Sequence, residues 1–230
     1  MDVLIACEES QRVCAEFRKR GHNAYSCDIV ETSGNNPEWH IRQNVIDLLN
    51  GYCAFVTQDL QVHYELWYKR WDIIIAFPPC THLAVSGAKH FEKKRLDGSQ
   101  RQAIDFFCTI LNADCEKIAI ENPVGIISGK YIKKWFPDLA SQYKLPIKPN
   151  QIIQPYYFGD NHRKTTCLWL KNLPKLKPDN IVEPTLISYK CKNGKVVIFD
   201  EYMVHTKGNR ATHRSKTFPG IARAMAEQWG

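Results

Sequence analysis

The feature that most restricts the fold of this chain is an alternation of short apolar runs with segments of helical periodicity. The apolar runs have the length and composition of buried strands, and they occupy Val3–Cys7, Ala24–Ile29, Asp72–Phe77 and Lys117–Ile120. Apolar side chains at helical spacing predict helices between these runs, over Ser10–Arg20, Leu60–Trp71 and Gly98–Asp114. Strands that alternate with helices are joined by right-handed crossovers. The sequence therefore predicts an α/β fold with a mainly parallel sheet flanked by helices.

The last third of the chain has a different character, with shorter strand-like runs between prolines and bases. Three such runs and a final helix are predicted there, at Thr165–Leu170, Leu186–Tyr189, Lys195–Phe199 and Ile221–Trp229. Asn193-Gly194 separates the second run from the third, which favours a hairpin. We therefore predict a core over residues 1–170, a small basic β-rich region over 171–215, and a closing helix that returns to the core over 216–230.

Charge is divided unevenly along the chain. The formal net charge is +7, from 31 Lys and Arg against 24 Asp and Glu. Residues 1–115 carry a net charge of −3, and residues 116–230 carry one of +10. A basic half of this kind suits a polyanion such as nucleic acid, although a solvated lysine-rich surface explains the charge equally well.

The nine cysteines and eight histidines do not have the spacing of a metal site. The number of cysteines is odd and no Cys-x-x-Cys pair occurs, so we expect mostly buried, reduced thiols and no bound metal. The longest apolar run, Ile73–Phe77, is too short to span a bilayer. We therefore expect a cytoplasmic protein with no membrane partner.

Chemically capable side chains stand where the predicted strands end. One follows each of the four strands: Glu8, Asp28, Cys80 and Glu121. Ligands of parallel sheets bind outside the carboxyl ends of the strands, and packing alone does not require four such side chains at one edge. A cysteine after Pro78-Pro79 is by itself more often structural, so it is the ordered combination that indicates a site.

Pro78-Pro79-Cys80 after one strand and Glu121-Asn122-Pro123 after the next resemble the motifs of the DNA (cytosine-5) methyltransferases. The resemblance follows the order of nearly the whole chain and is closest to the small, phage-type members of that family. These members end in blocks similar to FGD…RKTTCLWLKNLP and SKTFPGIARAMAEQW of this chain. The resemblance implies a Rossmann-like methyltransferase fold that uses S-adenosylmethionine and acts on DNA, with residues 171–215 as the recognition region.

The resemblance also implies a covalent mechanism. Cys80 would add as a thiolate to carbon 6 of cytosine, and Glu121 would hold or protonate the ring nitrogen. Arg163 falls where the family has an arginine beside the flipped base. We expect nearby basic groups to favour the thiolate form of Cys80.

Cofactor contacts are implied at the carboxyl ends of the first strands. Asp28 would bind the ribose hydroxyls and Asp47 the adenine. The full set of implied cofactor residues is Cys7, Glu8, Glu9, Ser10, Asp28, Asp47 and Pro78. The chain departs from the family because its turn after the first strand contains no glycine, because Thr81 replaces the usual glutamine, and because Glu121-Asn122 is followed by proline.

Nucleic-acid contacts are expected from the loop after Cys80 and from the basic region. The residues are Ser86, Lys93, Lys94, Arg95, Lys164, Lys207, Arg210 and Arg214. The alternative for Lys93–Arg95 is an ordinary solvated run of charge. The alternative for His162 and Lys164 is a phosphate contact or plain solvation. The small size of the recognition region predicts a short target sequence or help from a partner.

Two other functions stay open from the sequence. The first is a related methyltransferase that acts on another pyrimidine: RNA, a modified base or a nucleotide. The second is a non-catalytic nucleic-acid-binding protein on the same fold, which the glycine-free turn favours and intact Cys80 and Glu121 oppose.

Overall fold

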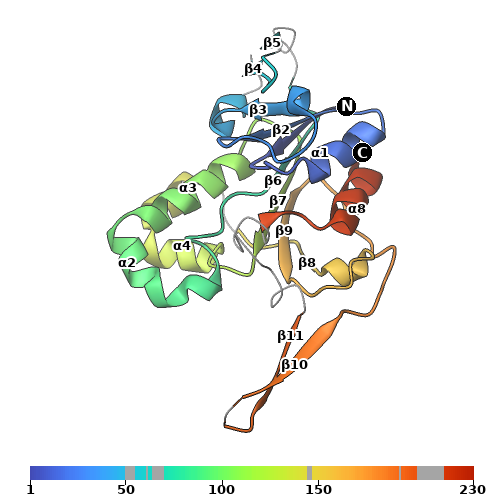
Figure 1. Cartoon of the computed structure of the whole chain (residues 1–230). Coiled ribbons are helices and arrows are strands. Elements are labelled where there is room, and N and C mark those ends of the chain that lie inside the picture. The colour runs from blue at the N-terminus through green and yellow to red at the C-terminus, as the bar shows by residue number, and fades with distance from the viewer. Residues whose placement is uncertain (50–54, 61, 64–69, 144–146, 192, 201–214) are drawn as a thin grey trace.

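The computed structural model describes the chain except for residues 50–54, 61, 64–69, 144–146, 192 and 201–214. Within the described residues, seven strands form the central sheet in the order β3-β2-β1-β6-β7-β9-β8 (Figure 1). Their bounds are Asp2–Ala6 for β1, Asn23–Asp28 for β2, His40–Arg42 for β3, Ile73–Ala76 for β6, Lys117–Pro123 for β7, Gln151–Ile153 for β8 and Thr166–Lys171 for β9.

The first five strands of this order run parallel, and β9 is antiparallel to both of its neighbours. When the five parallel strands are numbered 1 to 5 in chain order, they lie in the sheet in the order 3-2-1-4-5, which is the order of the doubly wound nucleotide-binding sheets. The predicted Rossmann-like α/β fold with a mainly parallel sheet is confirmed.

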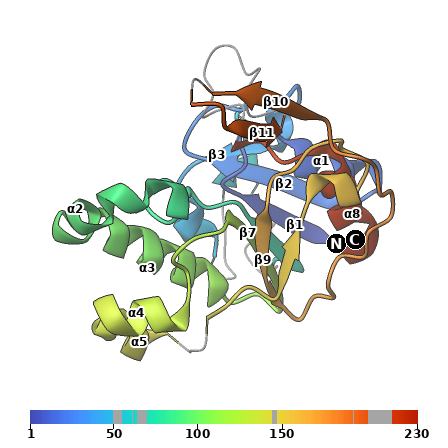
Figure 2. The same cartoon turned by 90° about the horizontal axis from the view of Figure 1, so that it is seen from below.

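Helices cover both faces of the sheet because successive side chains of the buried strands point to opposite sides. Val3 and Ile5 of β1 join the core under α1 (Arg12–Lys19) and α8 (Pro219–Trp229). Leu4 of β1 joins the other core, with the side chains of α3 (Ser99–Leu111). Figure 2 shows α1 and α8 on one side of the sheet. On the other side lie α3 and three short helices: α2 (Phe91–Leu96), α4 (Gly129–Trp135) and α5 (Pro137–Gln142).

Four 3₁₀ turns complete the described helical structure. They are η1 (Pro37–Trp39), η2 (Val45–Leu48), η4 (Val85–His90) and η5 (Pro155–Tyr157). Across the described part of the chain, no helix combines the length and hydropathy needed to cross a bilayer.

The predicted hairpin is confirmed: β10 (Leu186–Lys190) pairs antiparallel with β11 (Val196–Asp200) and projects from the body (Figure 1). The predicted final helix is also confirmed, as α8, which packs against α1. The division into parts at residues 170 and 215 stays a prediction.

The helix predicted over Leu60–Trp71 is wrong where the structure describes that segment. Val62–His63 form β5, which pairs with β4 (Phe55–Val56), and Trp71 is not helical. The Trp71 ring stacks on Phe55 with centroids 6.1 Å apart, and its indole N–H donates to the Leu48 carbonyl at 3.0 Å. Trp71, which the prediction placed in a helix, thus belongs to an aromatic cluster with Phe55 of β4 and Tyr25 of β2.

Candidate active site

Cys80 stands in a loop whose backbone is fixed on both sides. Pro78, two residues after β6 ends, is buried, and its carbonyl accepts a hydrogen bond of 2.8 Å from the Asn122 side-chain amide. The Cys80 carbonyl accepts from the N–H groups of Leu83 and Ala84, both at 2.9 Å. Of the eight described cysteines, only Cys80 is exposed. The loop therefore presents a positioned thiol at the carboxyl end of β6.

Glu121 and Asn122 lie within β7, whereas the sequence predicted that the strand stops before them. The strand continues to Pro123 because β9 pairs with it along its length, with Glu121 opposite Leu168 and Asn122 opposite Cys167. Glu121 is half-buried and Asn122 is buried. Placing these side chains on a paired strand makes them more rigid than a turn would.

The charges of Glu121 and of two lysines act on the Cys80 thiol. Although Cys80 is exposed as a residue, the surrounding protein partly desolvates its thiol, and this desolvation together with the nearby Glu121 carboxylate raises the pKa of Cys80, whereas the charges of Lys164 and Lys94 act to lower it. The two lysines act in the expected direction, towards the thiolate, but the net direction of the shift is upward in the free protein. The lysines are present, but desolvation and Glu121 outweigh them.

Lys164 is the residue that sequence reasoning ranked too low. Its charge acts on the Cys80 thiol, and it lies two residues before β9, the strand paired with the end of β7. The exposed Arg163 is anchored through its backbone, whose N–H donates to the Asp200 carboxylate at 2.6 Å. His162 lies 3.2 Å from the same buried carboxylate, at the end of β11. The catalytic role of Arg163 stays a prediction.

The turn after β1 has left-handed backbone without glycine. Cys7 has φ 58° and Gln11 has φ 57°, in the region that glycine adopts most easily. Two positions of the turn therefore adopt a backbone conformation that glycine would adopt more easily. The Gln11 amide fixes it by donating to the Asn36 carbonyl at 2.7 Å and accepting from the Asn36 N–H at 3.1 Å.

Glycine is required opposite this turn, at Gly34. A β-carbon there would lie 2.2 Å from Oε1 of Gln11. Glu9 joins the same loop, because its carboxylate accepts from the Ser33 N–H at 3.2 Å. Apart from its place in the turn, nothing in the sequence marks Gln11 as a residue of the site.

Glu8 is buried beneath α1 and acts as its N-terminal acceptor. Its carboxylate oxygens accept from the N–H groups of Val13 at 2.7 Å and Cys14 at 3.2 Å. Burial raises the pKa of Glu8 to about 7, although these hydrogen bonds oppose the shift. Because both oxygens are used by the helix, Glu8 supports the turn, and its predicted direct contact with a cofactor stays untested.

Glu8 should make stability depend on pH. The raised pKa of about 7, against an ordinary value of 4.5, stabilises the fold fully below pH 4.5, and this contribution is lost as the pH rises to about 7. The loss should be roughly 3 kcal/mol. Urea unfolding of Glu8→Gln from pH 4 to 8 should lack this fall, whereas Glu16→Gln on the outside of the same helix should keep it. An identical pH dependence in Glu8→Gln and the native protein would contradict the assignment.

Two further acids gather near the carboxyl ends of β1 and β2. Burial is the largest cause of the raised pKa of Cys7 and of Cys27, and the charge of Asp28, which ends β2, adds to both shifts. Asp47, exposed in η2, also raises the pKa of Cys27. Asp28 accepts a hydrogen bond from the Val30 N–H at 3.2 Å. The structure thus brings Cys7, Asp28 and Asp47 to one end of the sheet, and their contacts with a cofactor stay predictions.

The predicted nucleic-acid residues take different positions. Ser86 in η4 and Lys93 in α2 are exposed. The Lys94 ammonium donates to the Thr81 carbonyl at 2.6 Å, and Arg95 packs against Trp135, so these two side chains hold the structure together. Lys207, Arg210 and Arg214 lie outside the described residues.

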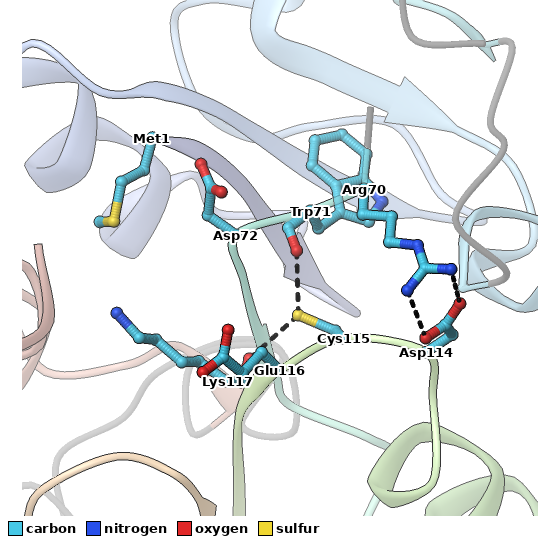
Figure 3. Close-up of a pocket in the computed structure, with 8 residues that line it drawn as sticks. All are labelled: Met1, Arg70, Trp71, Asp72, Asp114, Cys115, Glu116 and Lys117. Carbon is cyan, nitrogen blue, oxygen red and sulfur yellow. Dashed lines mark hydrogen bonds and ion pairs between the residues drawn. The ribbon is translucent and has the colours of Figure 1, made fainter. Parts of the chain in front are cut away.

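A hollow of about 330 Å³ opens at the other end of the sheet (Figure 3). Its lining includes Asp72 and Lys117, at the amino ends of β6 and β7. The Cys115 thiol there donates to the carbonyls of Trp71 at 3.1 Å and Lys117 at 3.2 Å. Because parallel sheets bind ligands at their carboxyl ends, we place the functional site at Cys80 instead.

Comparisons with known proteins give only distant likenesses. No family model and no curated protein matches the chain, whereas 22 solved chains do. One of them is named as a DNA modification methyltransferase encoded within an E. coli prophage. It has 16% sequence identity and a TM-score of 0.47, and the match covers 80% of this chain and 52% of that one. The chain thus spans about half the length of that protein.

Proposed function

We propose that this protein methylates carbon 5 of cytosine in DNA, with S-adenosylmethionine as methyl donor and Cys80 as covalent nucleophile. The observation that carries the proposal is the Cys80 loop. An exposed thiol is held by backbone hydrogen bonds at the carboxyl end of a parallel strand, where the charges of Glu121 and Lys164 act on it.

The residues of this site have the chemistry that the reaction needs. Carbon 5 of cytosine becomes nucleophilic when the Cys80 sulfur bonds to carbon 6. Glu121 would neutralise the charge that develops on the ring by holding a proton at the ring nitrogen. After methyl transfer, loss of the carbon 5 proton to a base or water breaks the sulfur–carbon bond and restores the thiolate.

The raised pKa of Cys80 means that its proton must leave as the substrate binds. Lys164 and Lys94 already lower the pKa of the thiol, and a bound base adjacent to Glu121 would reduce the opposing effect of that carboxylate. This explains how a thiol that is protonated in the free protein can act as a nucleophile in the complex.

The residues at the ends of β1 and β2 fit S-adenosylmethionine. When bound, this cofactor supplies a methyl group that leaves its sulfonium as an electrophile. Asp28 offers carboxylate oxygens suited to vicinal ribose hydroxyls, and it lies at the same end of the sheet as the turn after β1. Asp47 would contact the adenine, at the same end of the sheet.

A cytosine in a duplex must leave the base stack to reach the thiol. Ser86 and Lys93 are exposed in the segments that follow Cys80, and the β10–β11 ribbon projects from the body with Lys190 and Lys195 near its tip. A two-stranded ribbon fits the major groove of DNA, which supports a role of residues 171–215 in recognition.

Replacing Asp28 with alanine should weaken cofactor binding, because two charge-assisted hydrogen bonds to the ribose would be lost. We expect the Kd for S-adenosylmethionine to rise roughly 10-fold to 100-fold. Isothermal titration measures this directly, with Asp114→Ala at the other end of the sheet as control. If Asp28→Ala binds the cofactor with unchanged affinity, the ribose site lies elsewhere.

The substrate class is tested by methyl transfer from labelled S-adenosylmethionine to duplex DNA, RNA and free cytidine nucleotides. Transfer to cytosine in DNA alone supports the proposal. Transfer to RNA or nucleotides instead would assign another pyrimidine substrate, and cofactor binding without any transfer, or no cofactor binding at all, would favour a non-catalytic binding protein.

A further inference from the structure

A second surface of the molecule carries a dense positive charge, on the helices that follow Cys80 and β7. We propose that this surface binds the phosphate backbone of the nucleic acid whose base enters the Cys80 site. The inference rests on the proposed function. We call the surface the α2–α4 face, defined by the exposed side chains of Lys89, Lys93, Lys130, Lys133 and Lys134.

Charge on the α2–α4 face is almost entirely of one sign. Residues 89–95 and 129–135 contain seven Lys and Arg but one acid, Glu92. The lysines of α4 are spaced three and four residues apart, where like charges destabilise a helix. Asp138, the next acid after α4, pairs with Arg101. This concentration of charge suits a polyanionic ligand.

Aromatic rings join the two helices of the face. The Arg95 guanidinium lies 4.1 Å from the centroid of the Trp135 ring and donates to the Tyr131 hydroxyl at 3.2 Å. The Lys134 ammonium lies 4.7 Å from the same ring centroid. Trp135 is 41% exposed. Cations gathered around an exposed aromatic ring are typical of nucleic-acid-binding surfaces.

Hydrogen bonds connect this face to the loop of Cys80. The Tyr131 hydroxyl donates to the Gln100 side chain at 2.8 Å, and Gln100 donates to the His82 carbonyl at 3.2 Å. The Lys94 ammonium donates to the Thr81 carbonyl, the residue after Cys80. Figure 2 shows α2 and α4 on the same side of the sheet, with α3 between them. This connection to the Cys80 loop favours nucleic acid over an anionic membrane as the partner, because only a nucleic acid could place a base at the thiol and its phosphates on this face at once.

The test removes the charge of α4 with the triple variant Lys130→Ala, Lys133→Ala and Lys134→Ala. Alanine is the best helix former, so α4 should keep its fold. The matched control removes three exposed positive charges elsewhere, with Lys19→Ala, Arg70→Ala and Lys148→Ala. Binding of a labelled duplex of about 30 base pairs is measured by fluorescence anisotropy, without cofactor, from about 50 to about 200 mM salt.

Each phosphate contact contributes about 0.9 to the slope of log K against log salt concentration. We expect the α4 variant to lose about 1 to 3 from this slope, and the control to lose less than about 1.

Several outcomes would overturn the inference. Equal slopes in the two variants, or no duplex binding by the native protein at low salt, would exclude the α2–α4 face as a phosphate site. Loss of binding to phosphatidylserine vesicles, with DNA binding unchanged, would assign it to a membrane. If the native protein binds duplex through α4 but methylates nothing, the proposed function fails and the phosphate site stands.

Discussion

Cys80→Ala should have no measurable methyl transfer, because the variant cannot form the bond to carbon 6 that activates carbon 5. We expect turnover to fall by a factor on the order of 10⁴ or more. Binding of S-adenosylmethionine and of duplex DNA should change little, since Cys80 is exposed and its loop is held through backbone groups of Pro78 and Cys80 and not through the thiol. Radiolabelled methyl transfer and separate binding titrations measure the two effects.

The control for this variant is Cys115→Ser, which lies at the amino end of the sheet and keeps a donor for its two carbonyl partners. It should retain full turnover. Cys80→Ala with more than about a tenth of native activity would exclude covalent catalysis through this residue.

Glu121→Gln should slow methyl transfer by a factor on the order of 10² to 10⁴, because an amide cannot supply the proton that the ring nitrogen needs. The same change should make the free Cys80 thiol more reactive, although it slows methyl transfer. Removing the carboxylate removes one cause of the raised pKa of Cys80, so the pKa should fall. Iodoacetamide should then alkylate Cys80 faster near neutral pH, as mass spectrometry of the Cys80 peptide would show.

This pair of readouts separates a role in chemistry from a general loss of structure. Glu116→Gln removes a carboxylate just before β7, at the amino end of the sheet, and should change neither rate. If Glu121→Gln transfers methyl groups nearly as fast as the native protein, another group handles the ring nitrogen. If its alkylation rate is also unchanged, Glu121 does not act on Cys80.

Much of the fold could be predicted because strand and helix periodicity was strong where packing is two-sided. The runs at Val3–Cys7 and Asp72–Phe77 became β1 and β6, and the run at Gly98–Asp114 became α3. Leu60–Trp71 misled because Val62–His63 pair with β4 as β5, and because Trp71 packs against Tyr25 and Phe55 outside any helix. The extension of β7 through Glu121 could not be foreseen, since it depends on pairing with β9, more than 40 residues later in the chain.

The site could be predicted in its residue types but not in its supports. Cys80 and Asp28 stand at the carboxyl end of the sheet, as predicted, and Glu121 lies near that end within β7 instead of after it. The amide of Asn122 on Pro78 and the charge of Lys164 on Cys80 come from contacts between distant segments. The glycine-free turn seemed a departure, yet Cys7 and Gln11 adopt left-handed backbone there. Sequence shows which residues could react, whereas tertiary contacts decide which charges reach them.

The covalent step itself is tested most directly with duplex DNA that carries 5-fluorocytosine. Fluorine at carbon 5 blocks the final elimination, so a protein that attacks carbon 6 and transfers the methyl group traps itself on the DNA. With S-adenosylmethionine present, the account predicts a denaturant-stable protein–DNA complex that maps to Cys80 and is absent in Cys80→Ala. Absence of any adduct across duplexes of varied sequence, with binding of both cofactor and DNA demonstrated, would contradict it.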